Sequence, residues 1–241
     1  AEFVYMAVDP ARVIFNHLLI HTSGLAPWRD VFNAAGSAPP PPDKADPIGR
    51  SQRWQNALTA LCQYPFVGQP DGVVRYSDLG LMLLGEAVSR LHTGASGQLD
   101  KAIADRVLKS IDLSDVWFNP VKHGVKKTRI VPTEIDAMWR KRRVWGEVHD
   151  ENACGIGGVA GHAGLFASAR SVAEFGRAWL DNVDVFGIDS ELAATSTQEH
   201  AVTGPELRGL GWMLKSPENS SAGERFDLTS FRHTGFTGTS L

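Results

Sequence analysis

The chain has 241 residues, of which 43% are hydrophobic and 21% are charged, and its 24 basic and 27 acidic side chains give a net charge of −3. This is the composition of an ordinary globular protein, and it excludes the disordered and fibrous classes. Such a balanced charge gives no reason to expect nucleic acid or an anionic membrane as a partner, so we expect a small, near-neutral one.

No apolar run reaches the roughly 18 residues that a membrane span requires, so we predict no span in this chain. The sequence begins at Ala1 without an initiator Met or a recognisable leader, which leaves the compartment open. Its two cysteines, Cys62 and Cys154, lack the C-x-x-C spacing of a thiolate zinc site, and we expect two buried free thiols.

The first half of the chain predicts helices separated by loops. An apolar helix is expected over residues 12–25, ending where Gly24 can adopt the left-handed conformation. Prolines between residues 27 and 47 indicate an extended loop. Ser51 is then a suitable N-cap for a helix that places apolar side chains on one face, namely Trp54, Leu58 and Leu61.

Residues 76–91 predict a buried helix, because they are apolar nearly all round. An amphipathic helix is expected over residues 99–109, and long loops over residues 117–145. Ser171 and Glu174 have the spacing of a capping box at the start of a further helix.

Beyond Leu207 the pattern changes to short strands, predicted at residues 209–214, 225–229 and 231–234. Helices followed by strands, without regular alternation, indicate an α+β fold or a helical subdomain inserted into a sheet domain.

Three places combine chemically active residue types with loop context: Tyr76-Ser77-Asp78, residues 146–164, and His233-Thr234-Gly235. Each is weak alone; a tyrosine with its ordinary pKa near 10, for example, is protonated at neutral pH. Taken together and in this order, the two triplets match two of the three motifs that define serine β-lactamases and penicillin-binding proteins, Y-S-D and H-T-G in place of K-T-G.

The resemblance to that family covers about Val13 to Leu241. Four stretches carry it: HLLIHTSGL, YSDLGLMLLGEAVSRLHTG, GEVHDENACGIGGVAGHAGLFASARSVAEFGRAWL and FRHTGFTGTSL. They resemble the class C-like branch of esterases, D-aminopeptidases and DD-carboxypeptidases, and within it the cell-wall-associated group that includes penicillin-binding protein 4B. The resemblance implies one β-lactamase-like domain over residues 1–241, with a helical and loop subdomain over about 12–200 and an incomplete antiparallel sheet over 205–241. It also implies the cell envelope or periplasm and a small-molecule or peptidoglycan-peptide substrate.

By the same resemblance, Tyr76 relays a proton, with its pKa lowered by the lysine of an S-x-x-K motif. Asp78 holds that lysine through a charge-assisted bond. His233 occupies the lysine position of K-T-G, and Thr234 offers its hydroxyl to a substrate carboxylate or carbonyl. In the same motif Gly235 leaves room beside the strand, and the backbone N–H of Phe236 supplies half of an oxyanion hole.

The sequence departs from the family at the nucleophile. No serine in the chain is followed by lysine three residues later, and there is no G-x-S-x-G elbow. We therefore expect the chain to lack both the S-x-x-K segment and the final strands, and to be inactive as given, while its parent is a serine hydrolase. The alternative is a non-catalytic module that binds peptidoglycan or has a regulatory role. Hydrolysis of a β-lactam, a D-Ala peptide or an ester all remain open.

A glycine-rich loop carries residue types that bind metals, His149, Asp150, Glu151 and His162, but it lacks H-E-x-x-H spacing and a third histidine. We expect no metal or other cofactor, with metal-dependent hydrolysis as a weaker alternative. His149 is expected to support the loop near the substrate. His21 is expected to cap or bridge backbone inside the fold.

Overall fold

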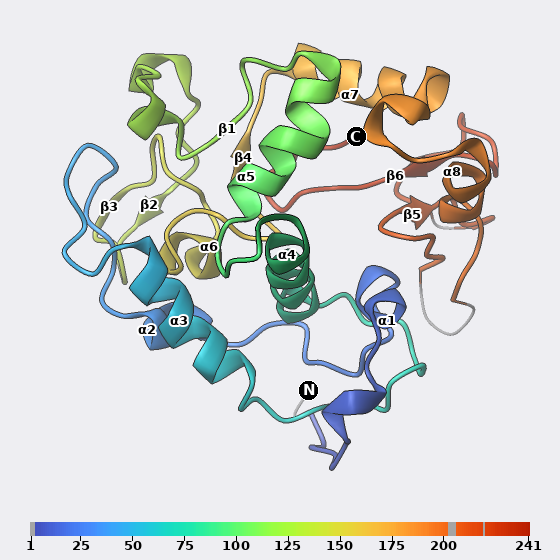
Figure 1. Ribbon diagram of the computed structural model, residues 1–241, viewed down its shortest axis with the longest axis horizontal. Helices are drawn as coiled ribbons and strands as arrows, with labels where there is room; N and C mark the ends of the chain where they lie inside the picture. The colour runs from blue at the N-terminus through green and yellow to red at the C-terminus, as the bar shows by residue number, and fades with distance from the viewer. Residues whose placement is uncertain (1–2, 202–205, 219) are drawn as a thin grey trace. The chain divides into compact units, whose positions relative to one another are not determined.

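The computed structural model of the protein, shown in Figure 1, describes residues 3–201, 206–218 and 220–241. Its α-helices are α1 (Phe15–Leu19), α2 (Val31–Ala35), α3 (Arg50–Leu61), α4 (Asp78–Thr93), α5 (Leu99–Ile103), α6 (Glu151–Gly155), α7 (Ala169–Asp181) and α8 (Ser190–Ser196). Shorter helical turns are η1 (Pro10–Arg12), η2 (Ala104–Leu108), η3 (Lys109–Ile111), η4 (Pro120–His123), η5 (Lys127–Arg129) and η6 (Val183–Phe186).

The strands form short antiparallel pairs. They are β1 (Trp117–Phe118) with β4 (Leu165–Phe166), β2 (Ile135–Asp136) with β3 (Arg142–Arg143), and β5 (Met213–Leu214) with β6 (Phe231–Arg232). Short antiparallel strands among helices confirm the predicted α+β class. Among the residues described, no helix is both long and apolar enough to cross a membrane.

Two long helices follow the sequence pattern closely. The helix predicted over residues 76–91 is α4, and the one predicted from Ser51 is α3. Gly49, not Ser51, occupies the N-cap of α3. A serine inside the first turn has the residue type of a cap, so the pattern alone misplaces the boundary by two residues.

The helix predicted over residues 12–25 is much shorter. It ends at Leu19, because the chain then turns at His21, whose φ is +61°. Gly24 has the expected left-handed φ of +77°, but it lies in the loop that follows. A Cβ there would come within 2.2 Å of the Gly68 carbonyl oxygen, so the close approach of a second segment requires glycine.

Three other expectations need correction. The predicted 99–109 helix is α-helical only in α5, since η2 and η3 continue it in other helical forms. The capping box at Ser171 is wrong, because α7 begins at Ala169 and the Ser171 N–H donates to Ser168 Oγ (3.1 Å). Residues 225–229 form turns instead of a strand.

The chain divides into two compact units, which are described separately. The first unit comprises residues 1–28, 65–84 and 175–241, and the second comprises residues 29–64 and 85–174.

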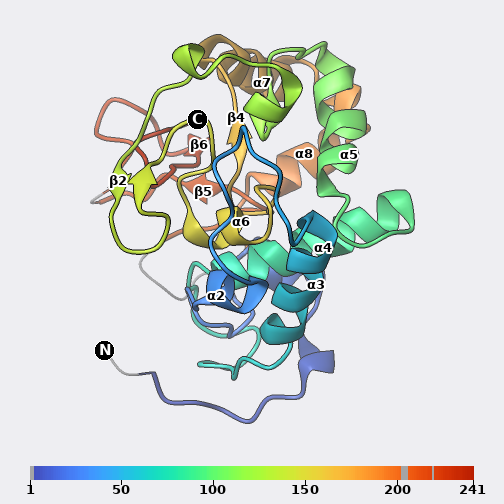
Figure 2. The same cartoon turned by 90° about the vertical axis from the view of Figure 1, so that its left-hand side faces the viewer.

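In the second unit, α2 packs against both α3 and α6, as Figure 2 shows. The α6 residue Asn152 is fully buried, and its Oδ1 accepts the N–H groups of Val31 (3.0 Å) and Phe32 (2.9 Å) at the start of α2. Its Nδ2 donates to the Arg29 carbonyl (2.9 Å). One amide side chain therefore satisfies two N–H groups that the start of α2 leaves without helical partners, and it also bonds to the carbonyl of the residue before the N-cap.

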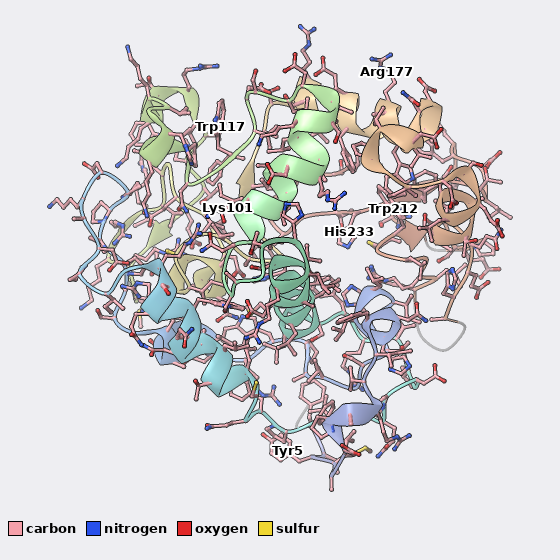
Figure 3. All side chains as sticks on the ribbon, in the orientation of Figure 1. Tyr5, Lys101, Trp117, Arg177, Trp212 and His233 are labelled. Carbon is pink, nitrogen blue, oxygen red and sulfur yellow. The ribbon has the colours of Figure 1, made fainter. Side chains whose placement is uncertain are left out.

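The first unit contains a small core of Ile20, Val74 and Ala201, against which Leu19 and Leu210 pack, and a separate series of contacting aromatic rings. The ring contacts run through Phe175, Trp179, Phe186, Trp212 and Phe231, and Trp179 and Phe231 both contact Trp212 edge-on. These rings fix β5 and β6 against α7, close in sequence to the second chemical triplet. Trp212 and His233 can be located in Figure 3.

The two cysteines are free thiols, as predicted, but only Cys154 is buried. Burial raises the pKa of the Cys154 thiol to about 12, so it stays protonated and unreactive at neutral pH. Cys62 is exposed at the end of α3, contrary to expectation, because it lies just beyond the apolar face of that helix.

Candidate functional site

Ser77, the middle residue of the first triplet, has a structural role. It is fully buried, and its Oγ donates to the Ala26 carbonyl (2.6 Å) and accepts the Gly80 N–H (3.2 Å). Its own N–H donates to Nδ1 of His21 (3.3 Å). Ser77 therefore caps α4 and ties it to the segment before Pro27, so this serine is committed to the fold.

The segment from His21 to Pro27 holds the triplet from both sides. The Arg75 N–H donates to the His21 carbonyl (2.8 Å), and the Asp78 N–H donates to the Pro27 carbonyl (2.9 Å). These bonds confirm that His21 bridges backbone inside the fold. They also fix Tyr76, which lies between the two anchored positions.

His21 is held as a neutral imidazole. It is 3% exposed, and burial, together with the charges of Arg208 and His233, lowers its pKa to about 3. Because Nδ1 accepts the Ser77 N–H, the proton of the neutral ring is on Nε2.

Three side chains surround the Tyr76 ring. The His21 ring centroid lies 4.6 Å from that of Tyr76, and the His233 centroid lies 6.2 Å away. Cζ of Arg208 lies over the Tyr76 ring, 5.8 Å from its centroid. The first unit thus brings together Tyr76 and His233, which are far apart in the sequence, and adds two residues that were not predicted to be near them.

Arg208 is the member that sequence reasoning missed. Its residue is 2% exposed, its Nη2 donates to the carboxylate of Glu206, and its Nε is buried without a hydrogen-bond partner among the described residues. A signal existed in the sequence, since a lone arginine precedes the apolar stretch Gly209 to Leu214 that we predicted as a strand. A buried cation is unusual enough to require an explanation.

His233 lies at the base of a hairpin. Its N–H donates to the Leu241 carbonyl and its carbonyl accepts the Leu241 N–H, both at 3.0 Å. Its Nδ1 lies 2.9 Å from the Thr234 carbonyl, so Nδ1 carries the proton of the neutral ring and Nε2 is an acceptor. Burial lowers the pKa of His233; the bond to Thr234 opposes this effect, and the charge of Arg208 adds to it.

The residues that follow His233 build the hairpin turn. Thr234 forms a bridge with Ser240, and the Gly235 N–H donates to the Thr239 carbonyl (2.8 Å). A Cβ at Gly235 would lie 2.1 Å from Thr239 Oγ1, so here the glycine makes room for the returning strand. Phe236 is at the tip of the turn, and its side chain is 96% exposed.

The glycine-rich loop belongs to the second unit, where its polar residues bond to one another. Asp150 Oδ1 caps α6 by accepting the Ala153 N–H (2.7 Å) and lies 2.8 Å from His162 Nε2. Burial opposes ionisation of Asp150, but the bonds from His162 and Ala153 hold its pKa below the ordinary value. His149 Nδ1 lies 2.9 Å from the Thr133 hydroxyl. The expected contact of His149 with substrate stays a prediction.

With this geometry in place, comparisons with known proteins are decisive. The profile of the family described as Beta-lactamase matches residues 7–241. The chain belongs to the beta-lactamase family. A relative from Escherichia coli K12 named "Putative D-alanyl-D-alanine carboxypeptidase" is 30% identical over 209 residues, which are 78% of this chain and 46% of the relative. One from Salmonella typhi with the same name is 30% identical over 211 residues, with the same coverage.

Two solved structures show the same fold. The octameric penicillin-binding protein homologue from Pyrococcus abyssi matches with a TM-score of 0.55 and 17% identity, over 82% of this chain and 42% of that one. A D-stereospecific amidohydrolase from Streptomyces matches with a TM-score of 0.55 and 17% identity, over 88% and 59% of the two chains. They confirm the predicted β-lactamase and transpeptidase-like fold.

Members of this family are serine hydrolases, and the present chain spans about half the length of the curated relatives that it matches. The site in its first unit offers a phenol, two neutral imidazoles and one permanently charged guanidinium. A phenol beside a cation can exchange a proton more readily than a free tyrosine, since the cation stabilises the phenolate.

Proposed function

We propose that the protein to which this chain belongs cleaves an amide or ester through an acyl-serine, with Tyr76 relaying the proton. One observation carries this proposal: Tyr76 and His233, each from a separate motif, lie with their ring centroids 6.2 Å apart in a member of the beta-lactamase family. General acid–base transfer by a positioned side chain contributes about 10²- to 10⁴-fold to rate.

The other roles follow the order of the motifs. Asp78, at the start of α4, holds the lysine of the nucleophile segment. Thr234 offers its hydroxyl to the substrate, and the Phe236 N–H contributes to the oxyanion hole. The names of the curated relatives favour a peptide ending in D-alanine as substrate. A single β-lactamase-like domain over residues 1–241 is part of this proposal.

The 241 residues contain no serine followed by lysine three positions later. We therefore expect that this chain alone forms no acyl-enzyme with a fluorescent penicillin or a fluorophosphonate probe. Mass spectrometry of the intact chain measures this directly. A stoichiometric adduct on any of its serines would mean that the nucleophile is present and that the motif assignment is wrong.

The relay role is tested in a parent protein that includes the nucleophile segment. Tyr76→Phe removes only the hydroxyl, so kcat/KM for acylation should fall at least about 10²-fold while the circular dichroism spectrum is unchanged. The matched control is Tyr64→Phe in the second unit, whose hydroxyl donates to the Asp30 carbonyl (3.0 Å). Near-normal kcat/KM in Tyr76→Phe would exclude the relay.

A further inference from the structure

Of the side chains that contact the Tyr76 ring, the two histidines are neutral and the arginine is charged. The pKa of His21 is lowered to about 3 and that of His233 is also lowered, in both cases chiefly by burial. Both imidazoles are therefore uncharged at neutral pH. Arg208, by contrast, carries a guanidinium group, which does not lose its proton in the physiological range.

The geometry of Arg208 is that of a fixed charge. Its guanidinium is held on one side by the Glu206 carboxylate and covers the Tyr76 ring on the other. Arg208 also forms backbone bridges to Ala201 and Met213, which set its Cα position. The Nε of this buried guanidinium lacks a hydrogen-bond partner among the described residues, and burying such a group costs stability.

We propose that Arg208, and not His233, is the positively charged group of this site, so that it attracts the carboxylate of a substrate while His233 serves as a neutral hydrogen-bond acceptor. The carboxylate part of this inference rests on the proposed function. Arg208 acts here through the attraction of its charge for that carboxylate and through its contact with the Tyr76 ring.

The tautomer of His233 supports this division of roles. Its Nδ1 proton is directed to the Thr234 carbonyl, which leaves the Nε2 lone pair as the remaining polar group of the neutral ring. A lone pair repels a carboxylate and instead accepts a hydrogen bond from a hydroxyl or an amine. His233 can therefore bind the carboxylate only after protonation, whereas Arg208 needs no proton.

The charged and titratable groups around His233 act in both directions. Arg208 and Arg232 disfavour its protonation, while Glu206 favours it, and the neighbouring His21 is itself uncharged over the pH range in which His233 titrates. Arg232 donates to the Ser221 hydroxyl. Because Arg208 and Glu206 carry opposite charges, neutralising each of them should shift the pKa of His233 in opposite directions. A merely structural role for Arg208 would not produce this pattern.

The first experiment uses the 241-residue chain and follows the His233 ring resonances by NMR from pH 4 to 8.5, assigned with His233→Gln. In Arg208→Gln the titration midpoint should rise by roughly 0.5 to 2 pH units, the range expected when one unit charge several ångströms away is removed, from the dielectric of water to that near a protein surface. Arg208→Lys should keep the wild-type midpoint. Glu206→Gln should lower it. Equal midpoints in all four proteins overturn the proposal.

The second experiment measures binding of N-acetyl-D-alanyl-D-alanine and of its C-terminal amide at pH 7.5 by NMR. Wild type should prefer the acid, Arg208→Gln should lose the preference, and His233→Gln should keep it. Loss of the preference in His233→Gln alone overturns the proposal. If neither peptide binds while the opposite midpoint shifts persist, the charge assignment stands and the peptide substrate of the proposed function fails.

Discussion

Arg53 in the second unit and Arg208 in the first are both buried, and their guanidinium groups are satisfied very differently. In the second unit, Arg53 is fully buried, and it donates to both Asp46 oxygens (2.6 and 3.0 Å), to the Ser37 carbonyl (2.8 Å) and to the Gly155 carbonyl (3.3 Å). In the first unit, Arg208 has one carboxylate partner, an aromatic ring and an Nε without a partner among the described residues.

The difference separates scaffold from site. Arg53 joins the loop before α3 to the end of α6, and every nitrogen of its guanidinium has a bonded acceptor, as a structural cation requires. Arg208 lacks that completeness and lies against Tyr76, a side chain to which the family motif gives a chemical role. The contact with Tyr76 sets Arg208 apart from Arg140 of the second unit, which is also buried with Nε and Nη1 lacking partners among the described residues.

The strongest challenge to this comparison is to remove the satisfied arginine. Arg53→Met should lower the free energy of unfolding by about 3–5 kcal/mol, because the partly buried Asp46 and the carbonyl groups lose their donor. Urea unfolding followed by tryptophan fluorescence measures this loss. Arg170→Ala, which breaks the exposed pair with Glu174, is the control and should have no measurable effect. A loss below about 1 kcal/mol for Arg53→Met would mean that Arg53 is not a scaffold residue.

A second prediction concerns the site in the first unit, where the buried His21 should make the free energy of unfolding depend on pH. The pKa of His21 is about 3 in the fold and about 6.5 when unfolded, so between these values the unfolded chain binds the extra proton. Stability therefore falls as pH drops below 6.5 and levels off near pH 3. At pH 5 the loss from this residue is about 2 kcal/mol.

His21→Asn isolates this contribution. Asparagine tolerates the positive φ at this position, and its Oδ1 can replace Nδ1 as the acceptor of the Ser77 N–H. We expect the variant to lose much less stability than wild type between pH 7.5 and pH 5 in urea unfolding. Identical losses in the two proteins would show that His21 takes up its proton in the folded state at an ordinary pH.

A feature of the fold could be predicted from the sequence when its cause lies in neighbouring residues, and not when it depends on residues distant in the chain. The apolar pattern of residues 76–91 predicted α4, although the helix begins at Asp78 and Tyr76 precedes it, and the motif order indicated both family and fold. The premature end of α1 was not predictable, because it results from pairing with residues 67–77. Short-range patterns carry no information on such distant partners.

The candidate site divides in the same way. Tyr76 and His233 were found from motifs, and the bridging role of His21 followed from its buried context. Arg208 was missed because its significance depends on tertiary placement over a ring from another segment. A histidine with an ordinary pKa is already largely neutral at neutral pH, but the further lowering of the His233 pKa was out of reach, since burial in the folded chain causes it.

The smallest expected effect concerns Ser77, which separates the capping role from the chemical role within a single triplet. Ser77→Ala removes the acceptor of the Gly80 N–H and the donor to the buried Ala26 carbonyl, so the free energy of unfolding should fall by about 1–2 kcal/mol. Ser110→Ala is the control, because that exposed hydroxyl bonds only to the Arg106 carbonyl within its own helical turn. The NMR midpoint of His233 should stay unchanged in Ser77→Ala, since no charge near Tyr76 is altered. A shifted His233 midpoint together with an unchanged free energy of unfolding would contradict the capping role. Ser77 would then belong to the site, and another group would cap α4.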